Sequence, residues 1–521
     1  MSLIEIDNLT FAYPESEPCL TNVSSAVETG EVLLLVGAAA SGKSSFLRAI
    51  PGLIPNSSGG TISGQVTTAG RRTQDVEPAA FAGIIGFIHQ EPGEGFIADG
   101  VDAELRFGLV QLGLSERAIE RRIDEATDLM ALGSLRGRRL SECSGGERQR
   151  VALAAALSMA PTVLLADEPT GALDPGAADD FIDAMHRVNE DLGTTIVVAE
   201  HRLERFLPRG VQALHLERGR VVAQGALQRL IAEVPCIPMV VQLARLRGWS
   251  EIPLTVRDAR ELASHDHGLH AQTVRTPDET PGPTLIRARG LTVSLRAQAS
   301  PALNHVSIEV AEGSCIGVLG RNGSGKTTLL RALAGIIPIV QGEIDRCADT
   351  TVGYVTHDPS SLFTERTLRG ELERTRALRS LAPDSELVDR WLNLVRLSHV
   401  ASRSARTLSG GQRIRAAMAT IGVAEDRVLA LDEPTRGLDA DGQAVLRDVV
   451  AYTRSRGGAV LLATHDLELI ASLADRIITM SNGRISDEGT PREILTTGLL
   501  RPALARIVPD ALTLADIPPA R

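Results

Sequence analysis

The sequence predicts an α/β protein built from two similar domains in tandem, each with a mostly parallel sheet. Short apolar runs such as VLLLVG (32–37) and VLLAT (460–464) alternate with longer helix-like segments. This pattern is typical of buried parallel strands joined by helices in right-handed crossovers. Four short motifs also occur twice in the same order, which indicates duplication of a whole domain rather than a solenoid of short repeats. A chain of 521 residues has room for two such domains.

The duplicated motifs are a phosphate-loop pattern, an SGG motif, a D-E-P-T motif and a histidine after an apolar run. They read GAAASGKS (37–44), CSGGERQR (143–150), LLADEPTGALD (164–174) and VVAEH (197–201) in the first copy, and GRNGSGKT (320–327), LSGGQRIR (408–415), LALDEPTRGLD (429–439) and LLATH (461–465) in the second. Each copy starts with strand-like segments, LIEIDNLTFAY and LIRARGLTVSL. We predict a first domain at 1–225, its extension and a linker at 226–283, a second domain at 284–490 and a tail at 491–521.

The composition favours a reduced, globular protein of the cytosol. Hydrophobic residues make up 43% of the chain, and the formal net charge is −11, which argues against nucleic acid as the main partner. The five cysteines are odd in number and form no C-x-x-C pair, as expected of reduced thiols (Cys19, Cys143, Cys236, Cys315 and Cys347). The N-terminus does not resemble a signal peptide, and no apolar run is long enough to span a bilayer. A membrane role would therefore need other subunits.

Both phosphate loops have the form G-x-x-x-x-G-K-[ST], in which backbone N–H groups and a helix N-terminus surround phosphate oxygens. Lys43 and Lys326 are expected to reach the β- and γ-phosphates of ATP, and Ser44 and Thr327 to bind Mg²⁺. The further predicted ATP-binding residues of the loops are Gly37, Ser41, Gly42 and Ser45, and Gly320, Gly323, Ser324, Gly325 and Thr328. Ala40 stands where the second loop has Gly323; we expect it to have a negative φ and ATP binding to survive in weakened form.

An acidic pair ends an apolar strand in each copy, Asp167-Glu168 and Asp432-Glu433. A carboxylate at such a strand end can hold Mg²⁺, and the next one can polarise the attacking water. We therefore predict Asp167 and Asp432 as metal ligands.

The SGGE and SGGQ motifs, lying between a phosphate loop and D-E-P-T, resemble the signature of ABC ATPases, and this resemblance covers both copies. It implies two tandem ABC-type P-loop ATPase domains, each with a mostly parallel sheet core, an antiparallel β part and an α-helical subdomain. It also implies an intramolecular pair of domains, arranged head to tail around two ATP molecules, so that each phosphate loop faces the signature of the other copy.

The resemblance assigns roles residue by residue. Glu168 and Glu433 resemble the catalytic bases, and His201 and His465 the histidines that contact the γ-phosphate. Asp174 and Asp439 resemble residues of the loop that joins the halves. The first site would combine Lys43, Ser44, Gln90, Asp167, Glu168 and His201 with Ser409, Gly410, Gly411 and Gln412. The second would combine Lys326, Thr327, Asp432, Glu433 and His465 with Ser144, Gly145, Gly146 and Glu147.

Two departures from the family pattern predict unequal sites. Tyr13 is placed to stack on adenine, whereas the second copy has Leu295 beside Arg296. Gln90 in FIHQEP matches the family's loop glutamine, a ligand of Mg²⁺, but YVTHDP has His357 there, which can titrate near neutral pH. Both copies keep the glutamate and the histidine, so both sites are expected to be active.

Three segments resemble the ATPases of energy-coupling factor importers: EPGEGFIADGVDAELRFGLVQLGL (91–114), EHRLE (200–204) and VPCIPMVVQLARLRGWSEIPLTVRDAREL (234–262). This resemblance implies a transmembrane coupling protein and a small membrane substrate-binding protein as partners. The ATPase would then sit at the cytoplasmic face of the cell membrane, with coupling helices docked near Gln90 and His357. Vitamins or transition metal ions would be the cargo.

Two alternatives stay open: the fused ATPase of another ABC importer, for sugars or peptides, and a soluble ABC translation factor. The translation factor is disfavoured because it should carry a long, highly charged linker, whereas the segment here is short and contains prolines. The sequence SHDHGLH (264–270) could bind a soft divalent metal, but a solvated linker with incidental histidines is the favoured interpretation.

Overall fold

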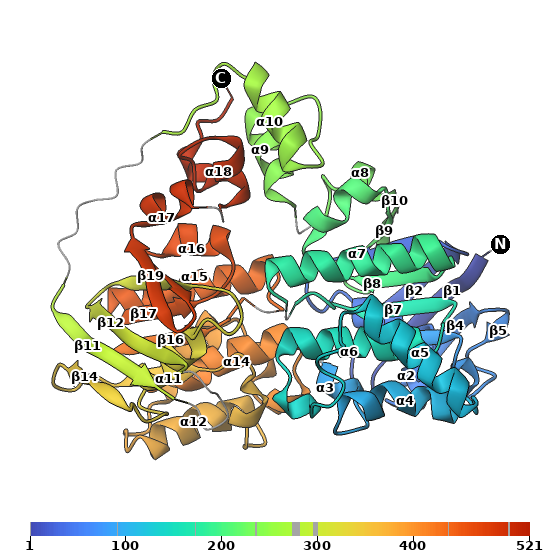
Figure 1. The fold of residues 1–521 in the computed structure, drawn as a ribbon, viewed down its shortest axis with the longest axis horizontal. Helices are drawn as coiled ribbons and strands as arrows, with labels where there is room; N and C mark the ends of the chain where they lie inside the picture. Colours follow the sequence, from blue (N-terminus) through green and yellow to red (C-terminus); the bar gives the residue numbers. More distant parts are fainter. Residues whose placement is uncertain are drawn as a thin grey trace. The chain divides into compact units, whose positions relative to one another are not determined.

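The computed structural model describes residues 2–90, 92–171, 173–234, 237–272, 282–294, 301–435, 437–498 and 501–520. They form two compact units, Met1–Pro238 and Met239–Arg521 (Figure 1). The predicted fold class is confirmed, since each unit contains a mostly parallel sheet, an antiparallel sheet and a group of helices.

The central sheet of the first unit has the order β10-β9-β3-β8-β7-β6 among the described residues. All neighbouring strands in it are parallel except β10 and β9. Its strands are β3 (Val32–Val36), β6 (Ile85–Ile88), β7 (Val163–Asp167), β8 (Thr195–Ala199), β9 (Gln212–Glu217) and β10 (Arg220–Ala226). The strands β3, β7 and β8 are almost fully buried, which explains why they are continuous apolar runs in the sequence.

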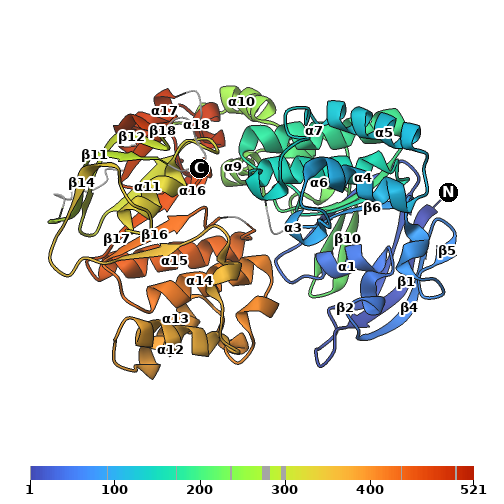
Figure 2. The ribbon, with the colours of Figure 1, turned by 60° about the horizontal axis from the view of Figure 1, so that its bottom comes forward.

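A second, antiparallel sheet of this unit has the order β2-β1-β4-β5. Its strands are β1 (Ser2–Ala12), β2 (Leu20–Glu28), β4 (Thr61–Thr68) and β5 (Arg71–Arg72). The helices of the unit are α1 (Lys43–Ala49), α2 (Leu53–Asn56), α3 (Pro92–Gly95), α4 (Val101–Gln111), α5 (Glu116–Leu129), α6 (Gly145–Ser158), α7 (Pro175–Leu192) and α8 (Leu227–Leu230). The helices α4, α5 and α6 pack together as a helical subdomain, apart from β1, β2 and β4 (Figure 2).

The second unit repeats this plan. Its central sheet has the order β15-β16-β17-β13-β18-β19 in the described part of the chain, the same order of equivalent strands as in the first unit. These strands are β13 (Cys315–Leu319), β15 (Val352–Val355), β16 (Val428–Asp432), β17 (Ala459–Ala463), β18 (Arg476–Ser481) and β19 (Arg484–Gly489). The antiparallel sheet is formed by β11 (Thr284–Val293), β12 (Leu303–Ala311) and β14 (Gln341–Arg346).

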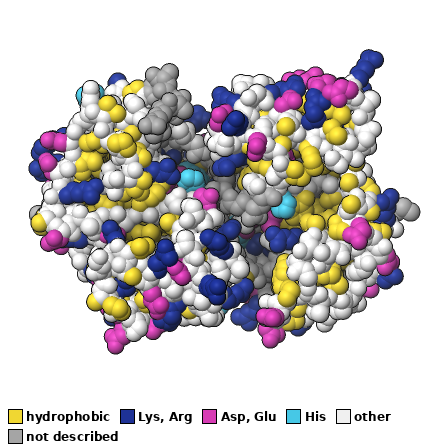
Figure 3. Space-filling view, turned by 90° about the horizontal axis from the view of Figure 1, so that it is seen from below, with side chains coloured by type: hydrophobic (Ala, Val, Ile, Leu, Met, Phe, Trp, Pro, Cys, Tyr) yellow, Lys and Arg dark blue, Asp and Glu magenta, His cyan; other side chains and the backbone are white. Residues whose placement is uncertain are grey.

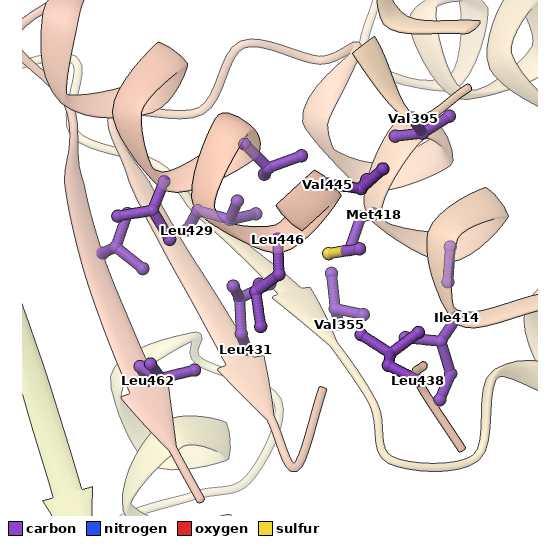
Figure 4. Close-up of a cluster of buried hydrophobic side chains, with 14 of the residues drawn as sticks. Val355, Val395, Ile414, Met418, Leu429, Leu431, Leu438, Val445, Leu446 and Leu462 are labelled. Atoms are coloured by element: carbon purple, nitrogen blue, oxygen red, sulfur yellow. The ribbon is translucent and has the colours of Figure 1, made fainter. Parts of the chain in front are cut away.

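The helices of the second unit are α9 (Met239–Arg247), α10 (Val256–His265), α11 (Lys326–Leu333), α12 (Leu368–Leu378), α13 (Ser385–Leu394), α14 (Gly410–Gly422), α15 (Ala440–Ser455), α16 (Leu467–Leu473), α17 (Pro491–Thr497) and α18 (Ala503–Ile507). The largest aliphatic cluster of this unit lies between its central sheet and the helices α14 and α15. Figure 4 shows Leu429 and Leu431 of β16 beside Leu446 of α15, with Met418 of α14 on the other side of Leu446. This contact joins the strand that ends in the second acidic pair to the helix that begins at the second SGG motif.

The segment predicted as extension and linker, 226–283, is divided between the two units. The helices α9 and α10 belong to the second unit, where they pack against α18 of the C-terminal tail (Figure 1). Arg247 is nearly buried there and donates to both oxygens of Asp266 and to the carbonyl of Pro518. The apolar stretch before residue 250 packs as expected, but it does so against the tail that ends the chain. The predicted domain boundaries themselves stay a prediction.

The surface of the protein is mixed in charge on the face drawn in Figure 3, where Lys and Arg side chains lie among Asp, Glu and apolar side chains. Among the described residues, no helix is long and apolar enough to cross a membrane.

Candidate functional site

Each phosphate loop connects a buried strand to a helix, β3 to α1 in the first unit and β13 to α11 in the second. The first glycine of each loop has little room: a Cβ on Gly37 would lie 2.3 Å from the carbonyl of Leu216, and one on Gly320 2.6 Å from that of Met480. The last glycine, Gly42 or Gly325, has a φ of +104° or +108°. These positions require glycine, because a side chain would clash with backbone or force a strained φ.

Ala40 departs from the prediction. Its φ is +59°, in the left-handed region, where the equivalent Gly323 has a φ of +80°. The expectation of a negative φ was wrong, because the loop imposes the same left-handed turn on both copies. A left-handed conformation costs an alanine about 1 kcal/mol, and a glycine almost nothing. The first loop is therefore strained at a position where the second is relaxed.

The loop lysines are buried and donate to the loop's own carbonyl groups. Lys43 Nζ lies 2.8 Å from the oxygen of Gly37 and 3.0 Å from that of Ala38, and Lys326 Nζ lies 2.6 Å from the oxygen of Gly320. Both ammonium groups thus stand inside the loop, where a phosphate oxygen could replace a carbonyl as the acceptor.

In the first unit, Glu168 follows β7 and is held by two donors. Gln90 Nε2 donates to Glu168 Oε2 at 2.7 Å, and His201 Nε2 lies 2.7 Å from Glu168 Oε1. The structure thus brings together three of the residues predicted for the first site. Gln90 contacts the predicted base here, rather than the predicted metal ligand Asp167.

In the second unit, His465 Nδ1 lies 2.9 Å from Glu433 Oε2, and Lys326 Nζ lies 3.5 Å from Glu433 Oε1. Burial raises the pKa of Glu433, but the hydrogen bond from His465 and the charge of Lys326 outweigh it and hold this pKa below its ordinary value. Thr327 Oγ1 donates to Asp432 Oδ1 at 3.1 Å, and His357 Nδ1 lies 3.7 Å from Asp432 Oδ2. The histidine that replaces the loop glutamine therefore contacts Asp432 and not the glutamate.

The SGG motifs begin the helices α6 and α14. Ser144 and Ser409 are the N-cap residues, and each forms a capping box with the residue three positions later, Glu147 or Gln412. The glycines Gly145, Gly146, Gly410 and Gly411 open the first turns. Each motif leaves backbone N–H groups at a helix N-terminus, which suits a phosphate. The predicted pairing of each motif with the other copy's phosphate loop stays a prediction.

The model of the ABC transporter family matches residues 20–171 and 303–436, the two ranges that contain both phosphate loops, both SGG motifs and both acidic pairs. The chain belongs to the ABC transporter family. It is an ATP-binding subunit of an ABC transporter, and its tandem ABC domains hydrolyse ATP.

Known relatives match this chain over most of their own length. An ABC transporter ATP-binding protein of Streptomyces coelicolor is 33% identical over 99% of both chains. A Bacillus subtilis protein described as a candidate HMP/thiamine import ATP-binding protein is 27% identical and covers 96% of this chain and 94% of its own. The structure of an archaeal ribosome recycling factor covers 96% of this chain and 92% of its own, with a TM-score of 0.58 and 21% identity. That last likeness concerns the ABC fold alone.

The pKa values of the two aspartates at the ends of β7 and β16 shift in opposite directions. Burial raises the pKa of Asp167 to about 6, and the neighbouring Glu168 charge adds to this effect. Burial acts in the same direction on Asp432, but donors from His357, Thr327 and Tyr354 together lower its pKa below the ordinary value. Ionising the aspartate therefore costs more free energy in the ABC domain of the first unit than in that of the second.

The oxygen-rich surroundings of both aspartates fit Mg²⁺, which prefers carboxylate and hydroxyl oxygens. Asp167 Oδ1 is buried without a hydrogen-bond partner among the described residues, and the Ser44 hydroxyl bonds to the same carboxylate. In the second ABC domain, Thr327 stands beside Asp432 in the same way. These four side chains would hold the metal.

Tyr13 lies beside the helix α1. Its hydroxyl is 3.2 Å from Ser45 Oγ, and its ring stands edge-on to Phe11 at 4.8 Å between centroids. The predicted counterparts Leu295 and Arg296 lie outside the described residues, so their role stays a prediction. Asp174 and Asp439 are the N-caps of α7 and α15 and accept from the backbone N–H groups of Ala177 and Gly442.

Several residues close to the ABC sites were not predicted as site residues from the sequence. Glu200 is 4% exposed and accepts from the backbone and hydroxyl of Thr170 at 2.9 and 2.6 Å, whereas the second copy has Thr464 bonded to Thr435. Burial raises the pKa of Glu200, and the Thr170 bonds oppose this. The difference between VVAEH and LLATH was the available signal.

In the sequence SHDHGLH, the aspartate is already engaged in hydrogen bonds. Asp266 is bound to Arg247 and to Trp249 Nε1, and the Arg247 hydrogen bond is the main reason that its pKa falls to about 2. Within the described ranges, no group of three or more His, Cys, Asp or Glu side chains could hold a metal ion. The interpretation as a solvated linker with incidental histidines stays a prediction.

Proposed function

We propose that this ABC subunit powers an importer of the energy-coupling factor type, with a transmembrane coupling protein and a small membrane substrate-binding protein as partners. The Bacillus subtilis relative, whose name includes HMP/thiamine import, supports a vitamin-type cargo. The observation that carries the proposal is an apolar groove in the helical subdomain of the first unit, next to the residue that binds the predicted catalytic base.

The groove has a volume of about 300 Å³. Its apolar lining includes Phe87, Phe96, Ile97, Phe107, Leu112 and Met159. Ile97 is 67% exposed and Phe107 38% exposed, so the groove continues onto an apolar surface. Glu104 fixes its wall, because it accepts from the backbone of Ile97 and Ala98 at 2.9 and 2.8 Å. An apolar helix of a membrane partner fits such a groove.

The position of the groove supports coupling between partner binding and ATP hydrolysis. His89 and Pro92 line it, and Gln90 stands between them with its amide bound to Glu168. A helix that moves this segment would move a donor of the proposed base. This link is the reason for proposing a transport-coupled role for the groove.

We propose the following roles at the ATP sites. Glu168 and Glu433 accept a proton from the attacking water, and His201 and His465 orient these carboxylates and bind the γ-phosphate. Lys43 and Lys326 exchange loop carbonyls for phosphate oxygens. Bound Mg²⁺ would neutralise charge on the phosphates, held by Ser44 and Asp167 or by Thr327 and Asp432. The signature residues complete each site from the other copy.

The test is affinity purification of the tagged chain from detergent-solubilised membranes of its native host, followed by mass spectrometry. Recovery of a coupling membrane protein with small substrate-binding proteins is expected, and the binder would indicate the cargo. Recovery of ribosomes would favour a soluble translation factor. Recovery of a permease pair with an external receptor would favour another type of importer.

Two matched variants test the groove. Ile97→Asp places a charge in it, whereas Leu192→Asp changes an equally exposed residue, 68%, at the end of α7. Loss of the membrane partner with Ile97→Asp alone is expected. Equal recovery with both variants would show that the partner docks elsewhere.

A further inference from the structure

Tyr354 of β15 binds the aspartate of the second ATP site. Its hydroxyl donates to Asp432 Oδ2 at 2.9 Å, and Arg331 Nε donates to the hydroxyl oxygen at 3.2 Å. The Arg331 guanidinium also lies over the Tyr354 ring, 5.7 Å from its centre. Asp432 is 1% exposed, so its oxygens depend on protein donors and on whatever the site binds.

The other oxygen of Asp432 faces the phosphate-loop helix, where Thr327 Oγ1 donates to Oδ1. With Tyr354 on Oδ2 and Thr327 on Oδ1, both oxygens have a donor, and the carboxylate has one orientation that satisfies both. Rotation about its χ angles would leave a buried oxygen without a partner, which is costly.

The first ATP site has no hydroxyl at the matching place. Phe87 pairs with Leu165, two residues before Asp167, as Tyr354 pairs with Ala430, two residues before Asp432. Phe87 cannot donate a hydrogen bond, and Asp167 Oδ1 is buried without a partner among the described residues. At this strand position the two copies therefore differ by one atom, the oxygen of Tyr354, which contacts the carboxylate.

We propose that Tyr354 is a positioning residue of the second ATP site: its hydroxyl holds Asp432 in the orientation that presents Oδ1, beside Thr327, to the metal. The site is thus arranged before the metal and the nucleotide bind, so less free energy is spent on ordering it. The inference rests on the metal role proposed above for Asp432, and it makes the second site the tighter of the two for a divalent cation.

The variant Tyr354→Phe removes only the hydroxyl and keeps the ring over Arg331. Phe87 shows that phenylalanine is compatible with this strand position in the same fold. The experiment uses the purified full chain with Asp167→Asn as background, so that the second site is the one that binds metal. Mn²⁺ with ADP is the probe, and electron paramagnetic resonance measures free Mn²⁺.

Tyr354→Phe is expected to raise the Kd of Mn²⁺ by about three- to tenfold, the range of one typical net hydrogen bond, because the hydroxyl acts on the metal only through Asp432. The affinity for ADP in EDTA is expected to stay unchanged. An unchanged Kd for Mn²⁺ would overturn the inference. Equal weakening of Mn²⁺ and of metal-free ADP binding would also overturn it, because it would show a general structural role.

Asp432→Asn in the same background separates this inference from the site assignment. It should abolish Mn²⁺ binding. If Mn²⁺ still binds as before, the proposed metal role of Asp432 fails. If Asp432→Asn abolishes binding and Tyr354→Phe changes nothing, the site assignment stands and only the role of Tyr354 fails.

Discussion

The two phosphate-loop sites share a fold and nearly all their motifs. They differ in the side chains that surround the aspartate and in the backbone strain of the loop. In the second, Asp432 has three donors near it and Glu433 is paired with Lys326. In the first, Asp167 carries a raised pKa and Ala40 a left-handed φ. The two copies keep the same loop geometry. Single side chains around each loop determine how much free energy it costs to ionise the aspartate of that site.

The largest effect is expected from removing the proposed bases. Glu433→Gln should lower kcat for ATP hydrolysis by roughly 100-fold or more, as loss of a general base does. Glu168→Gln should lower kcat by a clearly smaller factor. The first site contributes less to hydrolysis, because its aspartate has a raised pKa and its loop is strained at Ala40. Steady-state ATPase assays of both variants, with wild type as control, measure this. Equal losses would contradict unequal sites.

Isosteric changes of the two aspartates should have opposite effects on stability. The folded pKa of Asp167 is raised, so its charge destabilises the fold above about pH 6, and lowering the pH relieves this cost. Asp167→Asn should therefore stabilise the nucleotide-free chain at pH 7.5, by about 2–3 kcal/mol.

Asp432→Asn should instead destabilise the chain, by about 1–3 kcal/mol, because the donors around Asp432 favour its ionised form. That contribution is present above the ordinary pKa of an aspartate and is lost as the pH falls through the lowered one. Calorimetric unfolding in EDTA measures both variants. If both variants changed the free energy of unfolding in the same direction, the proposed difference between the two aspartates would be wrong.

Adding the missing hydroxyl should make the first site resemble the second. Phe87→Tyr, in an Asp432→Asn background, should lower the Kd of Mn²⁺ with ADP by about threefold, the value of one modest hydrogen bond. Phe87→Leu is the control for changes in packing and should not tighten binding. If both variants bound Mn²⁺ more tightly, the added hydroxyl would not be the cause of the tighter binding.

The smallest effect concerns the loop turn. Ala40→Gly should raise the free energy of unfolding by about 0.5 kcal/mol, since relief of strain is partly offset by the flexibility of glycine in the unfolded chain. Gly323→Ala should lower it by about 1 kcal/mol, because a Cβ there meets nothing within 4 Å and only φ is strained. Chemical denaturation measures both. A destabilising Ala40→Gly would contradict this account.

Much of the fold could be predicted because its signals are local. The apolar runs that became β3, β7, β13 and β17 are buried on both faces, and the motifs stand at their carboxyl ends. The segment after Gly225 was harder to assign. Arg247 of its helix α9 donates a hydrogen bond to the carbonyl of Pro518, 271 positions later in the chain. A contact between such distant residues produces no periodic pattern in the sequence that could predict it.

By itself, the sequence determined the duplication, the phosphate loops and the strand ends that carry acidic pairs. It could do so because glycine, lysine and carboxylate at these spacings have few other uses. Only the tertiary structure decided the φ of Ala40, the partner of Gln90 and the contact of Tyr354 with Asp432. These features depend on how the loop closes and on strands that come together from distant parts of the chain. A single oxygen atom or a single backbone angle then decides how the two sites differ.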